Sequence, residues 1–282
     1  MRVVVSLVIA LVGSLAGTLL VWYGGGHTVL TLGTAAATDA AVPFLLLTGL
    51  GGLLLAAAAA SVRWSPVGAI VAGAGHLVFS LPAFLVPFAP FESAASPSVK
   101  LLNSLYDVDS ALATGGYYFV AFGGGLLVGA ALLAAGIASR RRPTVTWRVL
   151  SAVGGVLAIA AGCWAFALGG DFYRLAVQVG DWQLATAVAP VVAALVFGVL
   201  LAPSGRSAIG AWIAGGVLAL GGVVLLVAEP VAFVGAPGAL LVTLPVLGWS
   251  GTVLVVGLSL LGLALGVMLR PAPPVEPVPA PV

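Results

Sequence analysis

The chain has 282 residues, of which 62% are hydrophobic and only 6% are charged, and its formal net charge is +2. A soluble domain carries about 25% charged residues, so this chain has too few polar groups to cover a globular core in water. The composition excludes a cytosolic enzyme, a nucleic-acid-binding protein and a disordered chain. It indicates an all-α, polytopic integral membrane protein.

Eight apolar runs are long enough to cross a bilayer as helices, since about 20 helical residues span about 30 Å of hydrocarbon. The first run is longer than the apolar core of a secretion signal, which predicts an uncleaved first helix. Pro82 and Pro190 fall inside the third and sixth runs and predict kinks there. In chain order the runs cover roughly 3–23, 41–61, 66–89, 113–138, 148–169, 184–202, 207–229 and 249–269.

The charged residues between these runs divide by sign. Eight arginines fall on the connections of one side, whereas Lys100 and Arg174 fall on the other side together with seven of the eight acidic residues. The positive-inside rule then predicts a multi-pass protein of the cell (plasma) membrane with both termini in the cytoplasm. The bias toward alanine, glycine, valine and leucine suggests a GC-rich prokaryotic source.

The order of features in residues 1–143 resembles that in residues 144–270. In each part a short turn with one arginine, Arg63 or Arg206, precedes a third run that begins with small residues. Four spans in each part is an even number, so the sequence predicts two parallel four-helix repeats. The alternative is that helices rich in leucine, alanine and glycine simply look alike. Residues 271–282 are proline-rich and predict a disordered cytoplasmic tail.

The connections differ in length between the two sides. Those at 62–65 and 203–206 are too short to hold a site. The outer connections are longer and cover roughly 24–40, 90–112, 170–183 and 230–248. Within the second of them, residues 99–107 predict a short amphipathic helix at the membrane interface.

His76 is the one ionisable side chain well inside a predicted span, ten residues beyond Pro66 and thus about 15 Å deep. An intramembrane titratable group of this kind is often functional, as a proton relay or a ligand of a cofactor. The alternative is a neutral histidine hydrogen-bonded to a neighbouring helix. His27 falls in a predicted outer loop, where solvent would surround it.

The outer connections hold the other polar candidates. Asp107 and Asp109 form a D-x-D pattern that could hold a divalent cation, or could simply end a helix at the interface. Asp171, Arg174 and Asp181 are expected to share one loop, and the spacing of the first two permits a helical salt bridge. A separate pair of acidic residues, each beside a proline, ends the third and seventh runs and either lines an outer vestibule or marks the water boundary: Glu92 and Glu229.

Three glycine pairs with the GxxxG spacing predict close helix packing, within the bundle or between copies of the chain. The pairs are Gly13 and Gly17, Gly125 and Gly129, and Gly262 and Gly266.

The sequence lacks a zinc-binding H-E-x-x-H helix, a nucleophile elbow and a phosphate-binding loop. We therefore expect no catalytic residue, no metal, no cofactor, and neither a nucleotide nor a nucleic-acid partner. The favoured function is a non-catalytic membrane protein, an accessory or subunit of a membrane or envelope assembly, whose partners are the lipid bilayer and a membrane protein or a second copy. The alternatives are a small-solute permease with a site between the two halves, and, less favoured, a membrane enzyme acting at the outer face.

Overall fold

The computed structural model describes residues 1–33, 38–85, 96–139, 144–227 and 238–270. Within these ranges the chain forms helices and no strand, which confirms the all-α prediction. The predicted tail at 271–282 lies outside the described residues.

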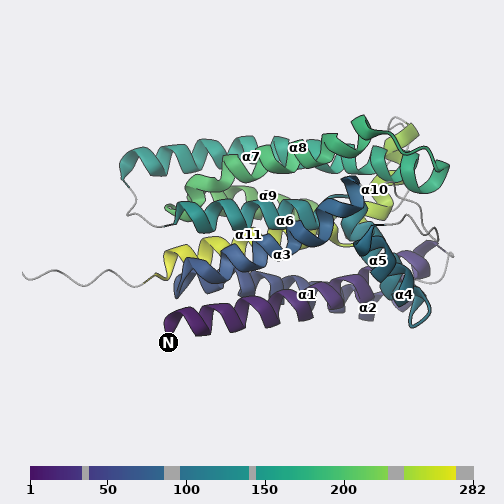
Figure 1. The fold of residues 1–282 in the computed structure, drawn as a ribbon, viewed down its shortest axis with the longest axis horizontal. Helices are drawn as coiled ribbons and strands as arrows, with labels where there is room; N and C mark the ends of the chain where they lie inside the picture. The colour runs from purple at the N-terminus through teal and green to yellow at the C-terminus, as the bar shows by residue number, and fades with distance from the viewer. Residues whose placement is uncertain (34–37, 86–95, 140–143, 228–237, 271–282) are drawn as a thin grey trace, which may run out of the picture.

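The helices follow one another in this order: α1 (Arg2–Gly33), α2 (Thr38–Ala60), η1 (Ser61–Arg63), α3 (Pro66–Leu85), α4 (Pro97–Tyr106), α5 (Ser110–Ala121), α6 (Gly124–Ala138), α7 (Val145–Phe172), η2 (Tyr173–Val179), α8 (Leu184–Leu201), η3 (Ala202–Gly205), α9 (Ile209–Val227), α10 (Gly238–Trp249) and α11 (Thr252–Met268). Most of them run along the long axis of the molecule, with the N-terminus at the end opposite α4 (Figure 1).

Each of the eight apolar runs contains a helix. In the described part of the chain, six helices are long and apolar enough to cross a membrane, and the bent pair α5–α6 makes a seventh if it is counted as one span. The helix in the last run, α11, has 17 residues. The structure is therefore that of a polytopic membrane protein with six to seven candidate spans by length and composition.

Two of the predicted spans are not single helices. The run 113–138 is divided between α5 and α6, which are bent by 58°, and the run 249–269 begins at the end of α10 and continues as α11. At both breaks a glycine has a positive φ, 76° at Gly123 and 69° at Gly251. Glycine adopts this left-handed backbone without the steric cost that a Cβ atom adds, so the chain can change direction there.

The predicted first loop, 24–40, is wrong over residues 24–33, because α1 continues to Gly33. Three consecutive glycines, which weaken an isolated helix, lie where three other segments approach. Gly24 lies against α2 at Thr48, Gly25 against Ser250, and Gly26 against the backbone of α5. Tertiary packing therefore keeps this stretch helical. Consequently His27 lies on α1 and not in a loop.

The predicted loop 170–183 is mostly helical as well. Helix α7 ends at Phe172, and a π-helical segment, η2, follows and is closed by Gly180 with φ 76°. Asp171 and Arg174 therefore lie on consecutive helical segments. Asp181 follows Gly180 outside η2, so the three residues do not share a loop.

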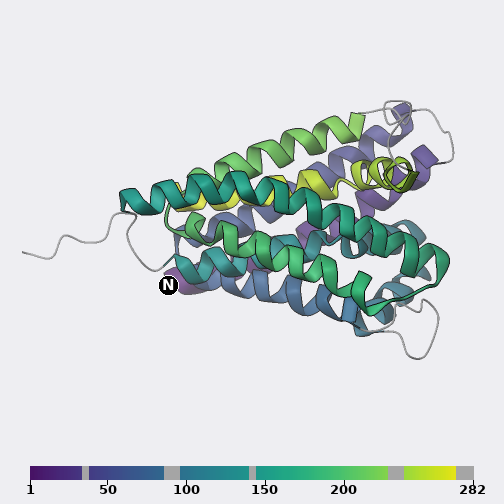
Figure 2. The same ribbon diagram turned by 90° about the horizontal axis from the view of Figure 1, so that it is seen from above.

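The core of the bundle is built on α6 and α11. Eleven of the 15 residues of α6 and 12 of the 17 residues of α11 are buried. Helix α6 packs against α3 and α8, while α11 packs against α9 and α2. Figure 2 shows α10 (yellow-green) at the end of the molecule farthest from the N-terminus. The outward faces of α1, α7, α8 and α9 expose leucine and valine, as lipid-facing surfaces do.

At the end of the bundle near the N-terminus, side chains tie helix ends together. Arg270 donates hydrogen bonds to the carbonyl oxygens of Val62, Ser139 and Gly205, at 3.1, 3.0 and 3.1 Å. Burial lowers the pKa of its guanidinium from the ordinary value. Arg206 donates to the carbonyl of Ala138 at 2.9 Å. Carbonyls left free at helix ends are thereby satisfied.

Candidate functional site

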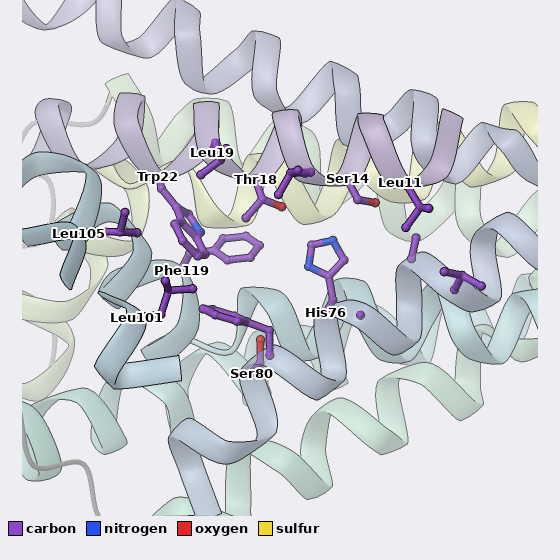
Figure 3. Close-up of a pocket in the computed structure, with 15 residues that line it drawn as sticks. Leu11, Ser14, Thr18, Leu19, Trp22, His76, Ser80, Leu101, Leu105 and Phe119 are labelled. Carbon is purple, nitrogen blue, oxygen red and sulfur yellow. The ribbon is translucent and has the colours of Figure 1, made fainter. Parts of the chain in front are cut away.

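A cavity of about 390 Å³ lies between α1 and α3, with α4 and α5 at one side. This volume is within the range of roughly 300–1,000 Å³ that is usual for small-molecule sites. Most of its lining is aliphatic or aromatic, and the described residues that line it include no Asp, Glu, Lys or Arg. We call it the α1–α3 cavity. Figure 3 shows its walls, and the lining polar side chains are Ser14, Thr18, Trp22, His76 and Ser80.

His76 projects from α3 into this cavity. Its side chain points toward α1, where Ser14 and Thr18 lie (Figure 3). The residue is 9% exposed, and its ring has Phe119 of α5 as an aromatic neighbour at 6.4 Å between centroids. His76 therefore lies inside the bundle, and its Nε2 has no hydrogen-bond partner among the described residues.

Three buried polar atoms in the walls of the α1–α3 cavity have no hydrogen-bond partner among the described residues. They are Ser14 Oγ, Trp22 Nε1 and His76 Nε2. A buried polar group left unpaired costs about 1–3 kcal/mol, and such groups are normally satisfied. Because all three belong to residues that line one cavity, the α1–α3 cavity is the candidate site.

Helix α4 forms part of the wall on the side away from the N-terminus. The sequence predicts this amphipathic helix at 99–107, and the structure has it at Pro97–Tyr106, with Ser96 as its N-cap. Leu101 and Leu105 line the cavity. Ser98 donates a hydrogen bond to the carbonyl oxygen of Phe79 and so fixes α4 to α3.

Asp107 and Asp109 belong to different helix ends. Asp107 caps the C-terminus of α4 and is exposed, whereas Asp109 caps α5 and accepts a hydrogen bond from the backbone N–H of Leu112 at 2.8 Å. No group of three or more His, Cys, Asp or Glu suited to a metal occurs in the described ranges. The D-x-D pattern here ends one helix and begins the next.

Sequence reasoning missed the surroundings of His27. Its Nε2 lies 3.7 Å from Asp109 Oδ2, and its ring stacks on Phe44 at 4.4 Å between centroids, with Tyr23 edge-on. This cluster joins α1, α2 and the start of α5. No local sequence pattern predicts this cluster, because His27, Asp109 and Phe44 come together only when α1 extends beyond the predicted span.

The other polar candidates are dispersed. Arg174 Nη2 lies 4.0 Å from Asp171 Oδ1, and both side chains are largely exposed, so their pairing contributes little to stability. Asp181 accepts a hydrogen bond from Gln183 at 2.7 Å. Glu92 and Glu229 lie outside the described residues.

The six glycines of the GxxxG pairs lie against neighbouring helices within one chain. A Cβ atom added at Gly13 or Gly17 would come within 2.9 Å of a carbonyl oxygen of α2, and one added at Gly129 would come equally close to Gly73 of α3. Gly125 faces Ser80, while Gly262 and Gly266 face the backbone at the end of α2. These glycines permit the close approach of the helices.

Ser14 Oγ and His76 Nε2 have no hydrogen-bond partner among the described residues, so these two atoms do not form the hydrogen bond that joins a nucleophile to its base. Comparison of the chain with protein-family models, with curated proteins and with solved structures finds no match.

Proposed function

We propose that this protein is a non-catalytic, multi-pass membrane protein that binds an amphiphilic molecule of the bilayer in the α1–α3 cavity. The observation that carries the proposal is that three polar atoms in the walls of a largely apolar cavity have no hydrogen-bond partner among the described residues. Such a role suits an accessory protein or subunit of a membrane assembly, because it needs no catalytic residue.

The cavity also bears on the two alternative functions. Its lining residues run from Leu11 to Phe119, so it lies within the first half of the chain, whereas a permease is expected to have its site between the halves. The buried residues of the central helices α6 and α11 are largely apolar. The outer aspartates, which an external enzyme would use, are dispersed over separate helix ends.

For the threading we propose eight spans, with both termini in the cytoplasm of a plasma membrane. The bent pair α5–α6 and helix α11, preceded by α10, would supply the seventh and eighth crossings. Support comes from the division of the charges: Arg63, Arg206 and Arg270 lie near one end of the bundle, while Asp107 and Asp109 lie at the other, beside α4. The positive-inside rule assigns the arginine-rich end to the cytoplasm.

We further propose that residues 1–143 and 144–270 are parallel repeats. A matching pair of serine contacts supports this. Ser6 Oγ lies 3.0 and 2.9 Å from the carbonyl oxygens of Ser61 and Ser65, and Ser151 Oγ lies 2.7 Å from the carbonyl oxygen of Ser207.

Two further pairs of glycines support the repeats. Gly68 packs against Ser6, and Gly210 packs against Ser151. Gly123 and Gly251 each precede the last helix of their half, with the same left-handed backbone.

The binding role is tested by native mass spectrometry of the protein extracted in mild detergent. The variant Gly75→Leu places a side chain at a cavity-lining position, where an added Cβ meets nothing within 4 Å. Gly216→Leu is the matched control, because its site on α9 is equally open but is not in the cavity wall. We expect the wild type and the control to carry a bound amphiphile and Gly75→Leu to lose it. Identical spectra for all three proteins would refute the proposal.

A further inference from the structure

We infer that the ligand of the α1–α3 cavity is an uncharged amphiphile whose head carries a hydrogen-bond-accepting oxygen, a ketone, quinone or alcohol, on an apolar tail. The inference rests on the proposed function and specifies the chemistry of its ligand. It follows from the donors in the wall, from the charge of the wall and from the side on which the cavity meets lipid.

The donors require an acceptor in the ligand. The indole N–H of Trp22 can donate but cannot accept, whereas the Ser14 hydroxyl and a neutral His76 imidazole can do either. All three atoms are buried and lack a hydrogen-bond partner in the part of the chain that the structure describes. A saturated hydrocarbon would fill the space but leave them unpaired. A carbonyl or hydroxyl oxygen between α1 and α3 would relieve this cost at the donor that it reaches. One oxygen does not reach both Ser14 and Trp22, because they are eight residues apart on α1, about 12 Å along its axis.

The wall also requires that the head be neutral. Among the described residues that line the cavity there is no lysine or arginine to pair with a phosphate or carboxylate, and no acidic residue to pair with an ammonium group. A charge inside the hydrocarbon is expensive unless it is paired. An anionic phospholipid or a fatty-acid anion is therefore excluded from the polar part of the cavity.

The tail has an apolar path to the lipid. Leu11 and Leu15 line the cavity and are also 49% and 67% exposed on the outer surface of α1. These side chains therefore border both the cavity and the surface that lipid covers. A ligand can enter sideways from the bilayer, with its head toward His76 and Trp22 and its tail along the leucines of α1.

The second half of the chain lacks the polar set. With the serine contacts above as the guide to alignment (Ser6 with Ser151, Ser65 with Ser207), Leu218 takes the place of His76, Ala167 that of Trp22 and Ile159 that of Ser14. Leu218 is buried, and its side chain lies near Gly162 of α7. The aligned helices α7 and α9 therefore pack without these polar groups, so packing alone does not require them between α1 and α3.

The experiment compares three photoreactive probes of equal chain length in phosphatidylcholine nanodiscs: a long-chain ketone, a fatty acid and an alkane, each with the same diazirine. Labelled peptides are identified by mass spectrometry. We expect the ketone to label α1 and α3, and the alkane and fatty acid to label them at least about tenfold less at equal concentration, given the value of the hydrogen bonds formed. Unlabelled competitors then distinguish an alcohol ligand from a quinone ligand. An isoprenoid alcohol and a short-tailed quinone are each added, and the class that reduces ketone labelling more is the better match to the cavity.

Of the variants Trp22→Phe and Ser14→Ala, the one that removes the donor bound by the ketone oxygen should weaken ketone labelling by about fivefold to tenfold, and unchanged labelling in both would overturn the inference about the head. The control Ser259→Ala, which removes a hydroxyl from α11 that donates to the carbonyl of Val255, should leave the labelling unchanged. Equal labelling by alkane and ketone would overturn the inference about the head while the binding function stands. Absence of labelling in α1 and α3 by every probe would overturn both.

Discussion

At the scale of single residues, three polar atoms in the walls of the α1–α3 cavity are unusual because they are buried and lack a hydrogen-bond partner among the described residues, an arrangement expected to lower stability. Intramembrane histidine is costly unless it has a partner, and His76 Nε2 has none among the described residues. A protein retains such groups when they serve binding, at the expense of stability. This gives a test in which stability and binding change in opposite directions.

Replacing His76 with leucine, the residue aligned with it in the proposed second repeat, should stabilise the ligand-free protein by about 1–3 kcal/mol, because an unpaired buried group disappears. Ligand labelling should fall in the same variant. Thermal unfolding in detergent, after removal of bound lipid, measures the first effect. If stability drops instead, His76 has a structural partner and the cavity argument is wrong.

The glycine triplet in α1 yields a prediction about close packing. Gly26→Ala would place a methyl group against the carbonyl of Ala111 on α5, and such overpacking typically costs about 1–3 kcal/mol. Gly49→Ala is the control, because an added Cβ on α2 meets nothing within 4 Å. The unfolding midpoint should fall for Gly26→Ala and should be unchanged or higher for Gly49→Ala. Equal midpoints for the two variants would contradict the observed packing.

At the scale of elements, the sequence predicted which segments are helical better than it predicted where the helices end. Apolar runs identify helices because a bilayer requires about 20 apolar residues in succession. They failed at 24–33, where three consecutive glycines indicate a loop. The structure keeps that stretch helical through contacts with α2, α5 and Ser250, and such contacts leave no local pattern in the sequence.

The candidate site was predictable in the same limited way. His76 is recognisable because an ionisable residue within an apolar run is rare. Ser14 and Trp22 resemble ordinary residues of a membrane helix, and their approach to His76 depends on how α1 packs against α3. The break between α5 and α6 was missed for a related reason, since Gly123 is one of 39 glycines and only its backbone conformation sets it apart.

That break can be tested through Gly123, whose φ is 76° and where an added Cβ meets no atom within 4 Å. Gly123→Ala should destabilise the protein by about 1–2 kcal/mol through backbone strain alone. Gly123→Asn should cost less, because asparagine tolerates the left-handed region. Chemical or thermal unfolding of both variants measures the difference, and equal stability of alanine and glycine would mean that the bend does not use this backbone conformation.

At the scale of the whole molecule, the two ends of the bundle differ in charge, and the proposed threading depends on this difference. Single cysteines at Arg63 and at Asp107, in a Cys163→Ser background, should react with a membrane-impermeant maleimide from opposite sides of intact cells or vesicles. The cytoplasmic side should be that of Arg63. Reaction of both positions from one side would overturn the eight-span model.

The proposed repeats predict equal roles for two serines. Ser6→Ala and Ser151→Ala each remove a hydroxyl that bonds buried backbone groups at the same end of the bundle, so each should cost about 0.5–1.5 kcal/mol. Because the two sites share no partner, the double variant should show the sum. Unfolding measurements on the three variants provide the test. A loss confined to one of the serines would count against the duplication.

The contacts of Arg270 have a consequence for biosynthesis. This side chain bonds to the carbonyl oxygens of Val62, Ser139 and Gly205. The ribosome synthesises these residues 208, 131 and 65 residues before Arg270, respectively. Until residue 270 leaves the exit tunnel, those three carbonyls lack this donor. The arginine-rich end of the bundle therefore takes its final structure only after the helices have been inserted. An affinity tag should be placed beyond residue 270, so that these contacts of Arg270 are kept.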